Sequence, residues 1–315
     1  MTALNLAGYL CALLLAGAGV MLVSHPSTPG RSAVESISTV VIETQADGRK
    51  AVRDARGMLV PIGQPQRIAA LDLVSDELLG HLVEPRRIAA VSAWAQGPEA
   101  WRHAGLPRLP GLTDLETVIQ LKPDLVLVST FGGETDRIER LRDSGIAVFD
   151  LGPAGGAREL CVNLRRIAAL VGAPERGERL AVQLERRLAA VAGHLPTTLP
   201  RRRALVLTPV VDQVYGGTTG TSFHDIVISA GLLDAAEGRF AEAWPRIGAE
   251  QALAIDPDLI VTRGGATNEL RRIPGFAGLR ALRNGAVIEL PVELYDSPGL
   301  SMLDAAELLH EKAYP

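Results

Sequence analysis

The chain is poor in the residue types on which several classes of protein depend. Its 315 residues include two cysteines, Cys11 and Cys161, so a framework of disulfides is excluded. The formal net charge is −4, which gives no basic field of the kind that binds a phosphate backbone. We therefore expect no nucleic-acid partner.

Signatures of catalytic and metal sites are also missing. The histidines form no i, i+4 pair and there is no C-x-x-C motif, so a metal site made by the protein is not expected. The glycine-rich segment 216–222 lacks the lysine of a phosphate-binding loop, and no G-x-S-x-G elbow occurs. Ser222, His224 and Asp225 are sequence neighbours, but a catalytic triad also needs facing groups and an oxyanion hole. We predict no catalytic residues, no resident cofactor and no enzymatic activity.

The N-terminus does contain a long apolar run. Residues 2–24 carry no charged side chain and end before a Pro/Gly-rich linker, which is typical of a secretory signal or a membrane anchor. Ala16-Gly17-Ala18 offers a small-residue cleavage site, but a basic segment before the run is missing, so both readings stay open. Bulky Leu10 before Cys11 argues against lipidation. We expect a periplasmic or other extracytoplasmic protein, either cleaved or anchored through residues 2–24.

One pattern occurs twice, in residues 116–128 and 250–262. Each copy opens on a glutamate, Glu116 or Glu250, continues as a short amphipathic segment, is ended by Pro-Asp at the same spacing, and then enters an apolar β-branched run. Proline lacks a backbone donor and disfavours helix at the residue before it, so each helix must end there. The apolar run suits a strand that is buried on both faces. The pattern predicts a duplicated α/β unit, and therefore two lobes with a cleft between them.

Strand and helix signals alternate through both halves. This rhythm predicts an α/β fold with two similar lobes and mainly parallel sheets. In the first lobe the expected strands are 68–71, 88–91, 125–128 and 146–149, and the expected helices are 74–82, 114–121 and 134–142. In the second lobe they are strands 204–207, 259–262 and 286–290 and helices 222–229, 249–254 and 301–311. One or two small hairpins are expected in residues 40–61.

A helical segment lies between the two copies. It covers residues 159–192 with a break at 172–174, and beyond the break Leu180, Leu184, Leu188 and Val191 recur at helical spacing. A helix of about twenty residues spans about 30 Å, enough to join both lobes; an ordinary surface helix of one lobe is the alternative. The predicted organisation is 1–24 signal peptide or membrane anchor, 25–66 linker and short hairpin, 67–155 N-terminal lobe, 156–196 interlobe helical connector and 197–315 C-terminal lobe.

Several short blocks between Arg67 and Pro315 carry a resemblance. They are Arg67-Ile68, 115–128, 244–250, Pro257-Asp258, 284–287 and 297–299. In order and spacing they resemble the iron–siderophore and cobalamin family of ABC-transporter substrate-binding proteins. The resemblance implies two α/β lobes joined by one long helix, a ligand in the cleft, and delivery to a membrane permease. It also implies that one surface glutamate of each lobe docks onto permease arginines, and the matching positions are Glu116 and Glu250.

Local chemistry offers another role for these glutamates. Thr113 and Glu116 have the spacing of a capping box, in which the glutamate returns to the N-cap amide. The second copy has Ile247 where the first has Thr113, so one shared capping box cannot account for both glutamates. We favour docking, with helix capping as the alternative.

Open parallel sheets bind ligands at the carboxyl ends of their strands. Aromatic side chains in these loops suit macrocyclic or aryl ligands, and arginines suit anionic groups. The candidate ligand-binding residues are Trp94, Phe131, Tyr215, Trp244, Arg246, Arg263 and Tyr295. Any of the aromatics could instead be core, and Arg246 could pair with Glu250. Leu300 stands where many members of the family carry arginine, which speaks against a strongly anionic ligand such as an iron–catecholate.

We predict an exported, monomeric binding protein. It would capture a metal chelate of the siderophore, haem or cobalamin class and deliver it to an ABC permease. The alternatives are a membrane-tethered sensor of the same ligand and a chelatase-like enzyme on the same fold. A chelatase needs a histidine and a carboxylate that converge in the cleft, and the loops after the predicted strands contain no histidine.

Overall fold

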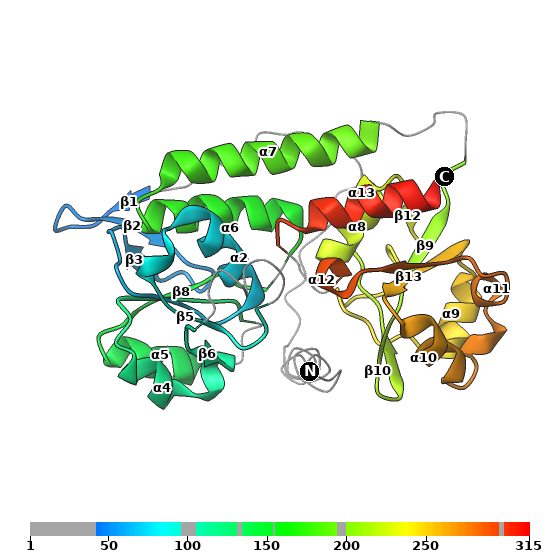
Figure 1. Ribbon diagram of the computed structural model, residues 1–315, viewed down its shortest axis with the longest axis horizontal. Coiled ribbons are helices and arrows are strands. Elements are labelled where there is room, and N and C mark those ends of the chain that lie inside the picture. Colours follow the sequence, from blue (N-terminus) through cyan, green and yellow to red (C-terminus); the bar gives the residue numbers. More distant parts are fainter. Residues whose placement is uncertain (1–41, 96–104, 131–133, 154, 194–199, 296–298) are drawn as a thin grey trace.

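Two α/β lobes lie side by side in the computed structural model, with one long helix, α7, running along both (Figure 1). The structure describes residues 42–95, 105–130, 134–153, 155–193, 200–295 and 299–315. The predicted fold class is confirmed, because each lobe contains a parallel sheet and α7 joins the lobes. Phe131 and the apolar segment 2–24 lie outside the described residues.

The N-terminal lobe is built on a five-stranded sheet in the order β6-β5-β4-β7-β8, and all its pairings are parallel. Its strands are β4 (Ile68–Ala70), β5 (Ile88–Ser92), β6 (Arg108–Leu109), β7 (Leu125–Val128) and β8 (Ala147–Asp150). Its helices are α2 (Leu73–Leu82), α4 (Leu115–Gln120), α5 (Thr135–Asp143) and α6 (Ala157–Leu170), with 3-10 turns at Pro85–Arg87 and Gly111–Thr113. All four residues of β7 are buried, as its unbroken apolar sequence predicts.

The C-terminal lobe repeats this arrangement around a parallel sheet in the order β12-β9-β13-β14. Its strands are β9 (Arg203–Val206), β12 (Leu233–Asp234), β13 (Leu259–Arg263) and β14 (Val287–Leu290). Its helices are α8 (Ser222–Ser229), α9 (Ala249–Ile255), α10 (Ala266–Arg272), α11 (Arg280–Arg283), α12 (Val292–Tyr295) and α13 (Met302–Ala313), with a 3-10 turn at Phe276–Gly278. The sequence did not predict α10, α11 or α12, nor the antiparallel hairpin of β10 (Thr208–Val210) and β11 (Gln213–Tyr215), because these short elements carry little periodicity.

A small antiparallel sheet precedes the N-terminal lobe. Its strands are β1 (Ile42–Thr44), β2 (Lys50–Arg53) and β3 (Leu59–Pro61). The turns use Gly48 and Gly57, both near φ +80°, a conformation that glycine adopts without a steric cost. The second turn is anchored to the lobe by two buried carboxylates: Arg56 pairs with Asp150 at 2.6 Å, and Arg142 pairs with Asp54 at 2.9 Å. The predicted hairpins are therefore one three-stranded sheet that is fixed to the lobe.

The duplicated pattern has the same backbone path in both lobes. Helices α4 and α9 are each followed by a left-handed residue that is not glycine, Lys122 at φ +47° and Asp256 at φ +43°. Each of these residues precedes the proline of the repeat, and the left-handed conformation reverses the chain immediately after the helix.

An arginine reinforces this turn in each lobe. Arg67, just before β4, donates from Nη2 to the carbonyl of Leu121 at 2.6 Å. Arg203, the first residue of β9, donates from Nη2 to the carbonyl of Ile255 at 3.0 Å. Each guanidinium satisfies a carbonyl at a helix C-terminus, where acceptors lack an intrahelical partner. The sequence pattern revealed the prolines of the repeat but not this pair of arginines.

The aspartates after the prolines are equivalent as well. Asp124 accepts a hydrogen bond from the backbone amide of Arg67 at 2.9 Å, and Asp258 accepts one from the amide of Arg203 at 2.9 Å. The strands that follow pair in the same register, Ile68 with Leu125 and Ala204 with Leu259. The two copies are therefore structurally equivalent, residue for residue, over this unit.

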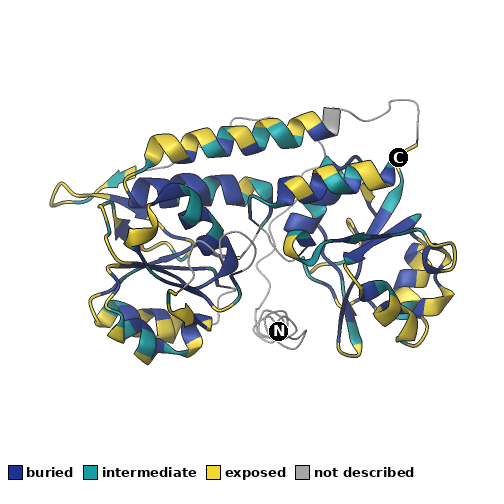
Figure 2. Ribbon diagram, viewed as in Figure 1, coloured by how far each residue is buried: buried dark blue, intermediate teal, exposed yellow. Residues whose placement is uncertain are grey.

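The predicted connector consists of two helices with different positions. Helix α6 packs on α2 and β2 of the N-terminal lobe, whereas α7 (Pro174–Gly193) packs on α6 and also on α8 and α13 of the C-terminal lobe. Figure 2 shows α6 largely buried beneath α7, whose outer face is exposed. Bridging is therefore done by α7, while α6 is part of the N-terminal lobe. Both helices are amphipathic, so periodicity alone could not assign these roles.

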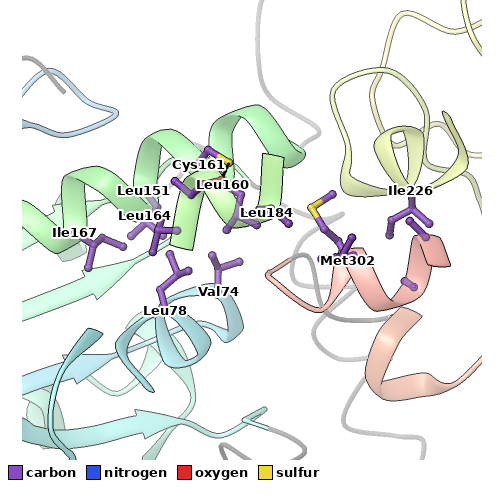
Figure 3. Close-up of a cluster of buried hydrophobic side chains, with 14 of the residues drawn as sticks. Val74, Leu78, Leu151, Leu160, Cys161, Leu164, Ile167, Leu184, Ile226 and Met302 are labelled. Carbon is purple, nitrogen blue, oxygen red and sulfur yellow. Dashed lines mark hydrogen bonds between the residues drawn. The ribbon is translucent and has the colours of Figure 1, made fainter. Parts of the chain in front are cut away.

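One apolar cluster continues from lobe to lobe. We call its central residues the interlobe core: Val74 and Leu78 of α2, Leu160 and Leu164 of α6, Leu184 of α7, Ile226 of α8 and Met302 of α13 (Figure 3). Each lobe has a further apolar cluster of its own. Burial of apolar surface stabilises by about 25 cal/mol per Å². A wide opening of the lobes would expose the interlobe core, so the structure favours small changes in the angle between the lobes.

Candidate ligand cleft and docking surface

The carboxyl edges of the two sheets face each other across the lobe boundary. In the N-terminal lobe the elements that follow β4 and β8 reach the other lobe, since Glu77 of α2 bonds to Ser301 and Ala157 of α6 bonds to Asp225. In each sheet the chain continues to one side from one central strand and to the other side from its neighbour. These neighbours are β4 and β7 in the N-terminal lobe and β9 and β13 in the C-terminal lobe. Ligands of open parallel sheets bind at such switch points. We therefore expect the candidate cleft between these two edges.

The N-terminal side of the cleft carries a small pocket and one described aromatic candidate. The pocket is lined by α2, by the loops after β7 and β8, and by the start of α6. Trp94 follows β5 and is half-buried. Its ring lies beside Gly111, where a Cβ would contact ring carbons at 3.7 Å. The ring of Trp94 therefore packs near the backbone of Gly111.

Tertiary contacts bring three of the C-terminal candidates together. Tyr215 and Arg246 form an isolated antiparallel bridge, so residues 243–247 run alongside β11. This places Trp244 and Arg246 beside Tyr215, which lies about thirty residues earlier in the sequence. Trp244 and Tyr215 are half-buried and Arg246 is exposed. The Tyr215 hydroxyl donates to Gln213 Oε1 at 2.6 Å.

Tyr295 is a core residue. Its side chain is 2% exposed, and its hydroxyl is 2.6 Å from Thr208 Oγ1. Its ring packs on Phe223 with a centroid distance of 4.5 Å, and Phe223 in turn meets Trp244 edge to face at 5.3 Å. Helix α12 begins directly after β14 and turns Tyr295 inward, which the sequence did not reveal. We therefore leave Tyr295 out of the candidate binding surface and note Phe223 as the residue that supports Trp244.

Arg263 is committed to a local ion pair. It lies at the end of β13 and its Nη2 is 3.0 Å from Glu269 Oε2 in α10. Its side chain is only partly exposed, which leaves Arg246 as the exposed guanidinium among the described candidates.

The neighbours Ser222, His224 and Asp225 have different partners. His224 Nδ1 lies 2.9 Å from Asp234 Oδ2, and this hydrogen bond raises the pKa of His224. Asp225 accepts from the backbone amide of Ala157 at 2.6 Å. The geometry therefore joins His224 to Asp234 and Asp225 to the other lobe.

Two buried carboxylates lie beneath the carboxyl edge of the N-terminal lobe. Asp72 caps α2 by accepting from the amide of Ser75 at 2.9 Å and from its hydroxyl at 2.6 Å, and burial raises the pKa of Asp72 to about 6. Asp76, one turn later, accepts from the amide of Ser92 at 3.1 Å, and burial raises the pKa of Asp76 to about 8. Asp76 is therefore largely protonated at neutral pH.

Asp76→Asn is expected to change how stability depends on pH. The folded pKa of Asp76, about 8, exceeds its ordinary value of 3.8. Its contribution is therefore fully present below pH 4 and is lost as the pH rises through 8, by up to about 1.4 kcal/mol per pH unit. Urea unfolding at pH 5, 7 and 9 should show a free energy of unfolding that falls more steeply with pH in the native protein than in the variant.

Asp136→Asn is the control for this experiment, because Asp136 is exposed on α5. It should follow the native protein at every pH. Parallel pH profiles for the native protein and Asp76→Asn would show that Asp76 does not titrate in this way.

Glu116 is exposed at the second residue of α4 and does not cap that helix. The N-cap is Asp114, whose carboxylate accepts from the amide of Thr117 at 3.2 Å. The Thr113 hydroxyl donates to the carbonyl of Pro110 at 2.7 Å. The alternative of a capping box between Thr113 and Glu116 is therefore wrong, because the helix begins one residue later than that box requires.

Glu250 has the equivalent position in the other lobe. It is exposed at the second residue of α9, whose N-cap is Gly248, and the amide of Gly248 donates to Gln251 Oε1 at 2.8 Å. Gln251 therefore fills the role that a capping glutamate would have. Helices α4 and α9 both lie away from α7 in Figure 1. The glutamates of the repeat thus present one exposed carboxylate on each lobe.

The described residues contain no helix with the length and apolar character needed to cross a bilayer. The predicted signal or anchor segment lies outside them and stays a prediction.

Comparison with known proteins adds independent findings. The family model for periplasmic binding protein matches residues 68–294. The vitamin B12-binding protein of Photorhabdus laumondii is 27% identical over 253 residues, which cover 78% of this chain and 86% of the relative. A solved structure of an ABC-type Fe3+-hydroxamate transport protein from Saccharomonospora viridis superposes with a TM-score of 0.70 at 21% identity, covering 84% of this chain and 99% of that one. The periplasmic vitamin B12 binding protein of Vibrio cholerae gives a TM-score of 0.64 at 20% identity, covering 78% and 96%. At these identities the two structures show a shared fold.

Proposed function

This chain belongs to the periplasmic binding protein family, and we propose that it captures a metal chelate between its lobes and hands it to an ABC importer. The observation that carries the proposal is the equivalence of Glu116 and Glu250, exposed at the same helical position on the two lobes that flank the cleft. One permease that contacts both carboxylates would engage both lobes at once. Neither glutamate caps its helix, which supports docking as their role.

The relatives and the aromatic candidates support the proposed ligand class. The similar proteins are named for vitamin B12 and for ferric hydroxamate, which are bulky metal chelates. Half-buried Trp94 on one side and Tyr215 and Trp244 on the other offer flat apolar faces for such a ligand, while Arg246 offers one cationic group. We include Phe131 as an expected member of this surface. Leu300 stands where many members of the family carry arginine, so Arg246 has no second cation beside it at that position. A ligand of low charge such as a cobalamin therefore fits this surface better than an iron–catecholate.

We further propose that the protein acts as an extracytoplasmic monomer. An anchor formed by residues 2–24 would keep it at the membrane next to the permease, and cleavage would release it. Mass analysis of the mature protein from cells distinguishes these two states.

Equilibrium dialysis with cyanocobalamin, haemin and a ferric hydroxamate tests the ligand class. We expect the native protein to bind at least one of them, and Trp244→Ala to weaken that binding by about tenfold or more, since a stacked aromatic contributes about 1.4 kcal/mol or more. Arg246→Gln should weaken only a ligand that carries anionic groups.

Tyr295→Phe is the matched control, because it removes a buried hydroxyl in the same aromatic cluster. It should lower the stability by about 1 kcal/mol and leave the affinity unchanged. A native protein that binds none of the three chelates contradicts the proposed ligand class.

A further inference from the structure

Two carboxylates, one from each lobe, accept hydrogen bonds from backbone amides of the opposite lobe. Asp225 of α8, in the C-terminal lobe, accepts at 2.6 Å from the backbone amide of Ala157, the first residue of α6 in the N-terminal lobe. Glu77 of α2, in the N-terminal lobe, accepts at 3.0 Å from the backbone amide of Ser301, directly before α13 in the C-terminal lobe. Each lobe therefore supplies an acceptor to the start of a helix in the other lobe.

Neither helix has a cap of its own at these positions. The N-cap of α6 is Gly156, which has no side chain, and the side chain of Ser301 makes no capping hydrogen bond. The first amides of a helix lack intrahelical partners, and a carboxylate there also interacts favourably with the helix dipole. Both helices are long, with 14 residues in α6 and 12 in α13. Asp225 thus supplies a side-chain acceptor at the start of α6, and Glu77 supplies one to the N-cap amide of α13, where the next two amides, Met302 and Leu303, bond to the carbonyls of Gly299 and Leu300.

Glycines make room for both contacts. A Cβ on Gly156 would overlap Asp225 Oδ2, and a Cβ on Gly299 would overlap Glu77 Oε2. Gly156 also has φ +96°, which other residues rarely adopt. The two close approaches therefore require glycine on the receiving side, in each lobe.

The two contacts also lie next to the interlobe core. Glu77 is adjacent to Leu78, and Asp225 is adjacent to Ile226. The ion pair of Arg187 with Glu307 at 2.9 Å also connects α7 with α13, but both side chains are exposed and such pairs contribute little. Apolar contacts are not directional, so the interlobe core opposes separation of the lobes but does not define their angle. Hydrogen bonds to particular amides are directional and favour one angle between the lobes.

We propose that Asp225 and Glu77 are positioning residues that set the angle between the lobes and thereby the width of the cleft. Because each carboxylate accepts from an amide at the start of a helix of the opposite lobe, rotation of the lobes would break both hydrogen bonds together. The angle is thus fixed before a ligand arrives. The effect of Asp225 and Glu77 on the angle between the lobes does not depend on a ligand. Their effect on which ligand binds rests on the proposed function.

Distances between spin labels in the full chain test this directly. Labels at Gln120→Cys in α4 and Leu253→Cys in α9, both exposed positions, report the separation of the lobes. Cys11→Ser avoids a third label, and the other native thiol, Cys161, is buried. We expect one narrow distance distribution in the native background, and a broader distribution in Glu77→Gln/Asp225→Asn, whose amides are weaker acceptors than carboxylates. Each single variant should lie between these two.

The controls are Glu159→Gln in the first turn of α6 and Glu311→Gln in α13, which change the same helices without touching the opposite lobe. Hydrogen exchange at the amides of Ala157 and Ser301 supplies the second measurement. Faster exchange at these amides with an unchanged distance distribution would mean local capping only and would overturn the proposal. If the double variant is too unstable to label, the single variants replace it. Unchanged distance distributions in both single variants would likewise overturn the proposal.

Binding separates this proposal from the proposed function. If the native protein binds two of the chelates named above, the double variant should shift the ratio of their dissociation constants by about threefold or more, since the cleft width is no longer fixed. An unchanged ratio would remove the role in ligand choice. If no chelate binds, the ligand class fails while the distance result stands.

Discussion

Replacing both Glu116 and Glu250 with arginine should abolish ligand uptake and leave ligand affinity unchanged. Both carboxylates are exposed at the second residue of a helix, one on each lobe. If they meet permease arginines, reversal turns two attractions into two repulsions. Close charge pairs at interfaces couple by about 1.5 to 7 kcal/mol, so a loss of uptake of about 100-fold or more is expected.

Each single reversal should reduce uptake only in part, because the remaining glutamate on the other lobe can still contact the permease. Exposed ion pairs are screened by salt, so the affinity of the native protein for permease-containing liposomes should fall as ionic strength rises. The measurement is uptake of labelled ligand by permease-containing liposomes, with affinity measured separately by dialysis.

A control with the same charge change is available on other helices. Glu175 is also the second residue of its helix, α7, and Glu311 is exposed on α13. The variant Glu175→Arg/Glu311→Arg alters the net charge equally, and for Glu175 it includes the same cost of a cation at a helix N-terminus, about 0.3 to 1 kcal/mol. It should transport normally. Docking is the wrong role if the Glu116/Glu250 variant loses affinity as much as uptake, or transports as well as this control.

Leu164→Ala should lower the free energy of unfolding by about 2 to 5 kcal/mol and should affect both lobes. Leu164 is fully buried on α6, within the interlobe core that includes Leu184 of α7 and Met302 of α13. Because this core belongs to both lobes, the lobes are expected to unfold in one transition.

Tryptophan reporters follow the two lobes separately. Trp244 reports on the C-terminal lobe when Trp94 and Trp101 are replaced by phenylalanine, and Trp94 reports on the other lobe when Trp101 and Trp244 are replaced. In urea, Leu164→Ala should move both fluorescence transitions by the same amount. Leu253→Ala, at an exposed position on α9, should change the stability by less than about 0.5 kcal/mol. A C-terminal transition that Leu164→Ala leaves in place would mean that the lobes unfold independently.

The elements that sequence reasoning predicted correctly are those with strong local signals. Strands β7 and β13 both begin with apolar runs directly after Pro-Asp, and helix α8 begins and ends where its pattern predicts. Elements with few residues, such as the β10–β11 hairpin and α12, carry no such pattern and were missed. The ligand-binding role of the candidate residues stays a prediction. Trp94, Tyr215, Trp244 and Arg246 lie at the carboxyl edge or beside it, whereas Tyr295 is core and Arg263 is paired with Glu269.

The sequence by itself determined that two equivalent α/β units exist and where each helix gives way to its strand. Proline geometry and side-chain periodicity act over a few residues, so they can be read without a fold. Only the tertiary structure decided which distant residues meet: the backbone of Arg246 beside that of Tyr215 within the C-terminal lobe, and, across the lobes, the interlobe core and the hydrogen bonds of Asp225 to the start of α6 and of Glu77 to the start of α13. These contacts join residues far apart in the chain, and they depend on side-chain direction and on the angle between the lobes, which no local pattern encodes.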